Sequence, residues 1–381
     1  MARNWADLPE ELLQLCSQHL CPKDLQALRA VCRSWRSAAI EERSDVPWLM
    51  LTDEAETPQR VFLCPSCRLV HKAPVPGAKA RRCFSSRGWL FALGWDGELH
   101  MLKNPMSSHH HIIKLPNLDK FLDISSDDGF YAKFVLSASP TTSPDYVVMV
   151  IYWRFEWLGP ISAWVGRLGL WKPSNKKWTT VNSPYPSYGI CDALFYKGCF
   201  LAINSKGSIL RWDMNGPSPS KAQVIFEMPP ILMNWGHLDL VQRSTAHLSP
   251  SALFLVQSTR ESLLIVSRWD RYKCKPKCDR TLRFHVFEID LNTRTCTEVK
   301  NLENMSLFLG FTSSFSLESD EKLHIKPNCI YFTDDPLDRW DIERVGINMG
   351  IYHIEDCTIE LDFMAMPYGR YSFPLWIEPS F

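Results

Sequence analysis

Residues 192–213 read Asp-Ala-Leu-Phe-Tyr-Lys-Gly-Cys-Phe-Leu-Ala-Ile-Asn-Ser-Lys-Gly-Ser-Ile-Leu-Arg-Trp-Asp. Two apolar runs meet at Lys197-Gly198, and a second Lys-Gly pair at Lys206-Gly207 leads into a third run that ends in Trp-Asp. Glycine adopts the backbone conformations of tight turns without steric cost. The stretch therefore predicts three short antiparallel strands joined by tight turns.

Similar strand-and-turn patterns recur along most of the chain, at residues 86–100, 168–179, 284–299 and 350–360. A four-stranded propeller blade takes about 40–50 residues, so the roughly 320 residues after the first 59 would hold about six or seven blades. The sequence predicts a mainly β chain with a β-propeller at 60–381. The alternative is one or two β-sandwiches. Trp376-Ile377 would complete a blade begun by Arg60–Leu63, which would remove an open sheet edge.

The first residues have a different, helical pattern. Asp7 and Pro9 are typical of a first helical turn, and leucines then recur at helical spacing. Pro22 ends one helix and can open the next. We predict three short helices at 4–44 and a connector at 45–59. A unit this small cannot bury a core of its own, so it packs either on its own domain or on a partner.

The residues of this unit favour a partner. Leu-Pro-Glu-Glu-Leu-Leu at 8–13, Leu-Cys-Pro-Lys-Asp-Leu at 20–25 and Arg-Ala-Val-Cys-Arg-Ser-Trp at 29–35 closely resemble an F-box in their order. An F-box is a three-helix module that docks on a Skp-type adaptor of a cullin–RING ubiquitin ligase. The resemblance implies an adaptor-binding set made of Leu8, Pro9, Leu12, Leu13, Leu20, Leu25, Leu28, Val31, Cys32 and Trp35.

The C-terminal third adds a second resemblance. Its most specific block is Asn-Cys-Ile-Tyr-Phe-Thr-Asp-Asp at 328–335, with Phe284–Asp290 before it and Trp376–Pro379 after it. Together they resemble plant F-box proteins with a KIB-type, kelch-like β-propeller, and the resemblance covers nearly the whole chain. It implies a non-catalytic substrate receptor of an SCF-type E3 ubiquitin ligase, whose propeller holds a target protein for ubiquitination. The identity of the target is not readable from the sequence.

Composition limits the other function classes. Lys and Arg together number 42, as do Asp and Glu, so we expect no general affinity for nucleic acid or membrane. Charged residues interrupt any apolar core of a secretory signal near the start. The 13 scattered cysteines then indicate reduced thiols and a cytoplasmic or nuclear location.

One cysteine pattern suggests metal chemistry. Cys64-Pro65-Ser66-Cys67 has zinc-ligand spacing, and His71 and Cys83 follow it. The favoured interpretation is a tight hairpin turn at Pro65-Ser66, so no cofactor is predicted. A zinc site at Cys64, Cys67, His71 and Cys83 is the less favoured alternative.

Other functions stay open. One alternative is an F-box protein without a role in degradation. A second is a propeller enzyme or glycan binder with incidental helices, and a third is a zinc-stabilised interaction module. The acid pairs at 127–128 and 334–335 are interpreted as turn residues. The stretch Trp153–Trp164 is the predicted exposed recognition loop, whereas most other tryptophans are expected to pack between blades.

Overall fold

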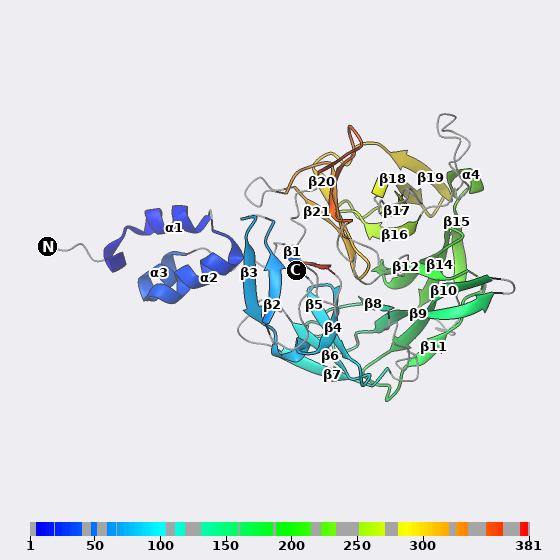
Figure 1. Cartoon of the computed structure of the whole chain (residues 1–381), viewed down its shortest axis with the longest axis horizontal. Helices are drawn as coiled ribbons and strands as arrows, with labels where there is room; N and C mark the ends of the chain where they lie inside the picture. The colour runs from blue at the N-terminus through cyan, green and yellow to red at the C-terminus, as the bar shows by residue number, and fades with distance from the viewer. Residues whose placement is uncertain are drawn as a thin grey trace, which may run out of the picture.

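The strands among the described residues form six sheets arranged in a ring, and the N-terminal helices project from one side of it (Figure 1). This arrangement comes from a computed structural model. The structure describes residues 5–18, 20–39, 47–51, 59–65, 67–103, 111–118, 131–158, 161–185, 188–214, 222–233, 251–270, 281–319, 325–333, 348–360 and 374–379. Within these residues no helix is long and apolar enough to cross a membrane.

Each sheet is one blade of a six-bladed propeller, in which neighbouring strands are hydrogen-bonded. In order of pairing, blade one contains β25 (Leu375–Ile377), β1 (Trp48–Met50), β2 (Gln59–Leu63) and β3 (Val70–Pro74). Blade two contains β4 (Arg81–Ser86), β5 (Trp89–Gly94), β6 (Leu99–Lys103) and β7 (His111–Leu115). Blade three contains β8 (Tyr131–Leu136), β9 (Val148–Leu158), β10 (Ile161–Trp171) and β11 (Thr179–Val181).

The other three blades complete the ring. Blade four contains β12 (Ile190–Tyr196), β13 (Cys199–Asn204), β14 (Ser208–Asp213) and β15 (Gln223–Glu227). Blade five contains β16 (Ala252–Gln257), β17 (Leu263–Asp270), β18 (Thr281–Asp290) and β19 (Thr295–Val299). Blade six contains β21 (Ser314–Glu318), β20 (Met305–Leu309), β22 (Cys329–Phe332), β23 (Gly350–His353) and β24 (Thr358–Glu360). Two single-turn helices, η2 (Pro76–Ala78) and α4 (Pro230–Met233), lie in connections. The prediction of about six or seven blades is confirmed.

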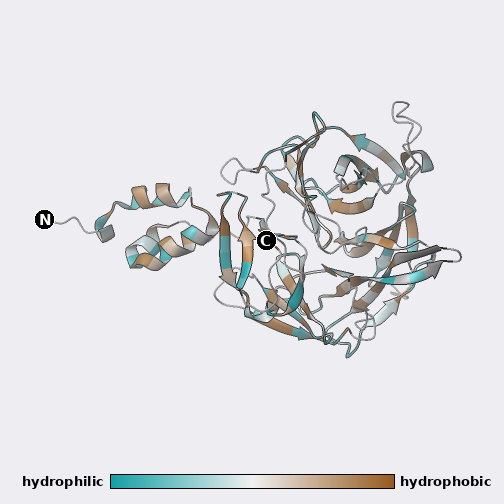
Figure 2. Ribbon diagram, viewed as in Figure 1, coloured by the Kyte–Doolittle hydropathy of each residue, from teal (hydrophilic) through white to brown (hydrophobic). Residues whose placement is uncertain are grey.

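The turns form as the sequence indicates. Lys197 and Gly198, which join β12 to β13, both have positive φ, 45° and 82°. Arg87 and Gly88 have φ of 48° and 72° between β4 and β5. Two successive residues at positive φ match the right-handed twist of a tight β-hairpin. In Figure 2, brown hydrophobic segments recur on strands around the ring, which is the half-buried pattern expected of blades.

The ring closes through blade one. Strand β25 pairs antiparallel with β1, with Trp48 opposite Ile377 and Met50 opposite Leu375. Closure by Trp376-Ile377 is thus as predicted, but two details differ. Its direct partner is β1, which lies inside the expected connector at 45–59, and β2 is one strand further out. A three-residue strand is too short to give a readable alternation in the sequence.

Blade six departs from the simple up-and-down order. Strand β22 runs parallel to β20, with Leu307 opposite Ile330, and the blade has five strands. All four residues of β22 are buried, as its continuous apolar run predicts. Gly310 ends β20 at a close contact. A Cβ atom there would lie 2.7 Å from the hydroxyl of Thr333.

The N-terminal helices form a separate unit, which we call the helical lobe. It contains η1 (Trp5–Asp7), α1 (Glu10–Gln18), α2 (Pro22–Val31) and α3 (Arg33–Ala38). Leu25, Leu28 and Ala39 are buried together in its small core. The indole N–H of Trp35 donates to the carbonyl oxygen of Trp5 at 3.0 Å, which fixes η1 against α3.

Candidate functional site

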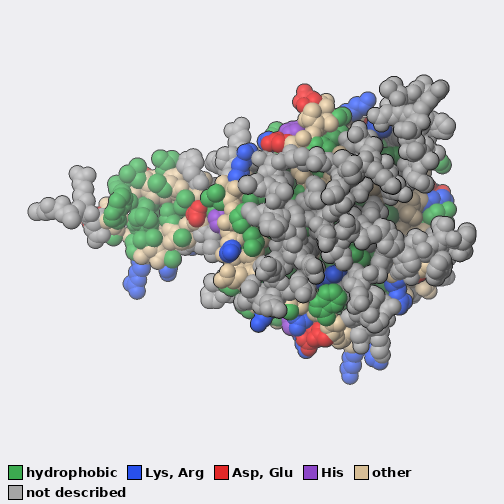
Figure 3. Space-filling model, viewed as in Figure 1, with side chains coloured by type: hydrophobic (Ala, Val, Ile, Leu, Met, Phe, Trp, Pro, Cys, Tyr) green, Lys and Arg blue, Asp and Glu red, His purple; other side chains and the backbone are tan. Residues whose placement is uncertain are grey.

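The helical lobe leaves an unusually large apolar surface in solvent. Trp5 is 75% exposed, Leu12 51%, Leu15 54% and Val31 58%. Figure 3 shows hydrophobic side chains gathered over this lobe. Burial of one such side chain contributes about 1.5–3 kcal/mol. Several exposed large apolar residues on one small unit indicate a protein-binding surface. We call these four residues the lobe face.

The ten residues predicted to bind an adaptor fall into three groups. Pro9, Leu12 and Val31 are exposed. The half-buried members are Leu8, Leu20, Cys32 and Trp35. The buried members are Leu13, Leu25 and Leu28. The adaptor-binding role of these ten residues stays a prediction, and the three buried leucines pack inside the lobe beneath the exposed members.

Sequence reasoning missed two members of the lobe face. Trp5 stands before the recognised leucine pattern, and it is the most exposed large apolar residue among those described. Leu15 follows Leu12 by three residues on α1, so the two share one side of that helix. The helical spacing was the available signal for Leu15.

The propeller encloses a cavity of about 890 Å³. It is lined by the strands β4, β8, β12, β16 and β21, and nine of its lining residues are serine or threonine. The side-chain oxygens of Ser85 and Thr312 are buried and have no hydrogen-bond partner among the described residues. A buried hydroxyl without a partner is costly, so these two oxygens are unsatisfied polar groups within the wall of the cavity.

A buried ion pair lies at the wall of this cavity. Lys133 on β8 is ion-paired with Asp192 on β12, and both side chains are almost fully buried. Asp192 also accepts a hydrogen bond from the backbone N–H of Leu255 at 2.9 Å and one from the hydroxyl of Ser314 at 3.2 Å. The pair thus connects blades three, four, five and six.

Charged and aromatic groups surround another part of the cavity. The backbone N–H of Arg87 donates to the carboxylate of Glu378 at 2.6 Å, and its guanidinium donates to the carbonyl oxygen of Phe195 at 3.2 Å. Burial raises the pKa of Glu378, and the charge of Arg87 partly offsets that shift. Hydroxyls, an arginine and an aromatic ring together suit recognition of a polar ligand.

Only part of the predicted recognition loop, Trp153–Trp164, lies among the described residues. Trp153 lies on β9 and is buried, with its ring centroid 4.8 Å from that of Phe311. It therefore packs inside the ring and is not an exposed recognition residue. Residues 159–160 and the side chains of 157–164 lie outside the described residues. The acid pairs at 127–128 and 334–335 lie outside them too.

The cysteine pattern has an unexpected third member. The Sγ atoms of Cys64, Cys67 and Cys21 all lie within 4.8 Å of one another. The predicted hairpin turn is also present, since the N–H of Arg68 donates to the carbonyl oxygen of Cys64 at 2.9 Å. Cys83 is not part of this group: it lies on β4, with its Sγ 3.8 Å from the carbonyl oxygen of Arg81. Cys21 was missed because it lies far away in the sequence.

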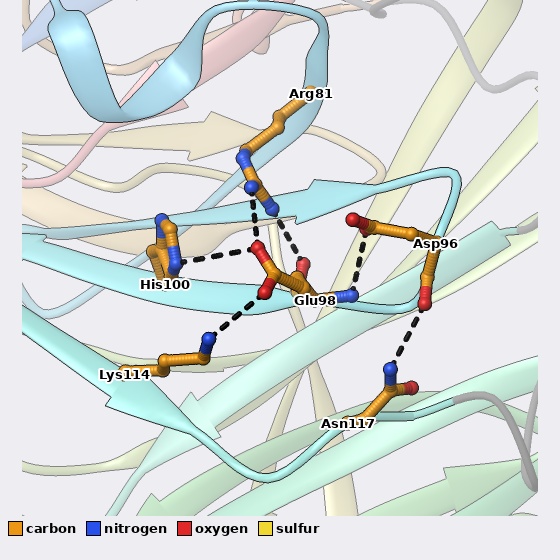
Figure 4. A network of polar contacts seen from close by, with 6 residues as sticks. All are labelled: Arg81, Asp96, Glu98, His100, Lys114 and Asn117. Carbon is orange, nitrogen blue, oxygen red and sulfur yellow. Dashed lines mark hydrogen bonds and ion pairs between the residues drawn. The ribbon is translucent and has the colours of Figure 1, made fainter.

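Polar contacts join three strands of blade two, as Figure 4 shows. Glu98 accepts hydrogen bonds from Arg81 at 2.9 Å and from Lys114 at 2.8 Å. These two bonds, Lys114 first, lower the pKa of Glu98 to about 2. Burial lowers the pKa of the neighbouring His100, whose Nε2 is 3.9 Å from the same carboxylate.

Comparison with known proteins adds a family and relatives. Residues 48–353 match the KIB1-4 beta-propeller family, and residues 5–45 match the F-box domain. Putative F-box protein At5g55150 of Arabidopsis thaliana is 21% identical over 389 residues, which cover 99% of this chain and 97% of that protein. F-box/kelch-repeat protein At1g57790 is 24% identical, covering 98% and 94%. F-box protein SKIP23 is 22% identical, covering 97% and 94%, and both are also from Arabidopsis thaliana.

Proposed function

Because the chain belongs to the KIB1-4 beta-propeller family and carries an F-box domain, we propose that it is a substrate receptor of an SCF-type ubiquitin ligase. The F-box binds the Skp-type adaptor, and the propeller holds a target protein. The three Arabidopsis relatives are F-box proteins by name, and each aligns over nearly its whole length.

One observation carries the adaptor assignment. The lobe face, Trp5, Leu12, Leu15 and Val31, is exposed although the propeller beside it is closed on itself. A stable interface buries about 800 Å² on each partner, and a few large side chains supply most of the binding energy. The lobe face offers a tryptophan and three aliphatic anchors for this purpose.

The proposed contribution of the propeller is positional. A receptor that holds a target near a ubiquitin-charged enzyme raises the effective concentration of the target lysine. The serine-rich cavity and the Arg87–Glu378 pair beside it are the described features suited to polar groups of a target. The receptor itself supplies no acid, base or nucleophile in this scheme, and it acts in the cytoplasm or nucleus.

The adaptor assignment is tested by co-purification. We expect Leu12→Asp combined with Leu15→Asp to weaken binding of a Skp-type adaptor by at least about 30-fold, since a hot-spot residue contributes about 2 kcal/mol or more. Ile112→Asp is the matched control, because Ile112 is 47% exposed on β7, in the propeller. Unchanged adaptor binding by the double variant, with the propeller still folded, would refute the assignment.

Target ubiquitination separates a receptor from an F-box protein without a role in degradation. Proteins close to the chain are identified by proximity labelling, in the wild type and in the Leu12→Asp/Leu15→Asp variant. We expect the targets to be labelled by both, but to be ubiquitinated only with the wild type. Labelled proteins whose ubiquitination is equal in both cases would argue against the receptor role.

A further inference from the structure

Three thiols that can bind soft metal ions meet where the helical lobe touches blade one, and the imidazole of His71 lies beside two of them. The three sulfurs of Cys21, Cys64 and Cys67 lie within 4.8 Å of one another. The Nε2 atom of His71 is 3.1 Å from the sulfur of Cys67 and 3.7 Å from that of Cys21. With Zn–S bonds of about 2.3 Å and Zn–N bonds of about 2.0 Å, ligand atoms of a tetrahedral site lie about 3.5–3.8 Å apart. We propose that these four residues bind a zinc ion that fastens the helical lobe to the propeller.

Three of the ligands come from one hairpin of blade one. The N–H of Cys64 donates to the carbonyl oxygen of Leu69 at 3.1 Å, and the N–H of Arg68 donates back to Cys64 at 2.9 Å. Arg68 has a φ of 56°, so the chain reverses directly after Cys67. The reversal keeps both thiols on one side of the turn and leads into β3, which carries His71.

The imidazole of His71 is held in place from the other side. Its ring lies edge-on to Trp48 of β1, with 5.5 Å between the ring centroids. His71 also lies opposite Phe62 in the pairing of β2 with β3. Its position is therefore set by the packing of blade one, which lowers the entropic cost of binding a metal.

The fourth ligand comes from the helical lobe. Cys21 is the N-cap residue of α2, and its side chain does not cap the helix. It is 4% exposed and belongs to the apolar core cluster that blade one shares with blades two and six. The positive end of the α2 dipole lies at Cys21 and would stabilise the thiolate that forms when a metal displaces the thiol proton. The nearby carboxylate of Asp24, whose oxygen is 3.4 Å from the Cys21 sulfur, further favours a cation.

The donor set selects the metal. Three thiols and one imidazole form a closed four-ligand set typical of structural zinc, whereas magnesium and calcium prefer oxygen ligands. Binding releases the three thiol protons to solvent, so zinc, three thiolates and a neutral imidazole leave a net charge of −1. In the absence of metal, the hydrogen bond to Cys64 and burial raise the pKa of Cys21, and burial raises that of Cys67.

This site has a consequence for how the two parts of the molecule are placed. A metal with one ligand in the lobe and three in the blade fixes the direction in which the lobe face points relative to the cavity. Its importance for ubiquitin transfer rests on the proposed function. The metal site itself does not, and it is tested by metal content alone.

The first test measures zinc in the full chain, purified without added chelator. Elemental analysis is expected to give one zinc per chain, and Cys64→Ser or Cys67→Ser is expected to lose it. Cys16→Ser and Cys83→Ala are the matched controls, one exposed in the lobe and one buried in blade two, and both are expected to keep it. Zinc-free protein from zinc-supplemented cells, or a disulfide between Cys64 and Cys67, would overturn the proposal.

The second test asks whether the ion joins the two parts. We expect Cys21→Ser to weaken zinc binding at least 10-fold in competition with a chromogenic chelator. We expect His71→Cys to retain the metal, with a cobalt spectrum that shows one more thiolate ligand than the wild type. Unchanged affinity in Cys21→Ser would overturn the joining role.

The third test needs no variant, so a failure to fold cannot obscure it. Removal of metal from the wild-type chain with a chelator is expected to lower its unfolding temperature. Added zinc is expected to restore that temperature, whereas magnesium is not. An unfolding temperature that is indifferent to both treatments would contradict a structural zinc ion.

Discussion

At the scale of single residues, Glu98 gives the clearest link between charge and stability. Its carboxylate bonds to Arg81 of β4 and Lys114 of β7, so one side chain beside β6 ties together three strands of blade two (Figure 4). The folded protein holds the pKa of Glu98 at about 2, below the value of 4.5 for an unperturbed glutamate. A lowered pKa in the folded state means that folding favours the ionised form.

The sign of the pH dependence follows from this shift. Glu98 contributes its full stabilisation above about pH 4.5 and loses it as the pH falls toward 2. We expect Glu98→Gln to lower the unfolding temperature at pH 7, and the difference from the wild type to shrink steadily between pH 4.5 and 2. Thermal unfolding followed by circular dichroism across this range measures it. Glu355→Gln, at an exposed turn of blade six, is the control, and an equal effect there would contradict the special role of Glu98.

Leu12 and Leu13 on α1 show that the sequence pattern alone does not predict which of two neighbouring leucines is buried. The leucine pattern placed both Leu12 and Leu13 in one adaptor-binding set, yet Leu12 is exposed and Leu13 is buried. Successive residues on a helix point about 100° apart, so one of the two had to face inward. Which one does so depends on where α3 packs, and that is a tertiary contact that the local pattern does not contain.

At the scale of elements, the closing strand β25 is the most sensitive part of the ring. Trp376 in its centre is fully buried, and its ring lies edge-on to Phe308 at 5.1 Å and to Tyr331 at 6.2 Å. These two rings belong to blade six. A single side chain in blade one therefore also secures the contact between the last blade and the first.

We expect Trp376→Ala to lower the free energy of unfolding by about 3–5 kcal/mol, as is typical when a large buried aromatic is removed. Denaturant unfolding measures this change. Trp95→Ala is the control, because Trp95 is 40% exposed, and its loss should cost less than about 1 kcal/mol. Similar costs for the two variants would mean that β25 does not secure the ring.

The helices and strands also show how much of the fold could be predicted from the sequence. Hairpins with Lys-Gly or Arg-Gly turns were predicted correctly, because the turn chemistry and the apolar runs are local signals. The parallel pairing of β20 with β22 was not predicted, because β21 stands between these two strands in the sequence and no local signal specifies their relative direction. The proximity of Cys21 to Cys64 and Cys67 was not predicted for the same reason, because only the folded chain brings these residues together.

At the scale of the whole molecule, the Lys133–Asp192 pair connects the blades around the cavity. Its groups and hydrogen-bond partners come from β8, β12, β16 and β21. Removing one partner of a buried ion pair leaves the other charge uncompensated, which typically costs about 3–5 kcal/mol. Replacing both partners by uncharged groups costs less.

We therefore expect Lys133→Met to destabilise the propeller by about 3–5 kcal/mol, and Lys133→Met combined with Asp192→Asn to recover a large part of that loss. Denaturant unfolding of the wild type, both single variants and the double variant forms a complete cycle. Additive costs in this cycle would show that the two side chains do not act as a pair. Adaptor binding by the helical lobe should be unaffected where the propeller remains folded.

The pairing of β25 with β1 also sets the order in which this molecule can be assembled. Strands β1, β2 and β3 leave the ribosome early, whereas their fourth partner is made only after all the other blades. Until then β1 presents an unpaired edge, which other chains can join. The helical lobe is complete long before that moment. A chain interrupted before Leu375 would thus carry the helices that recognise a partner on a ring that is still open.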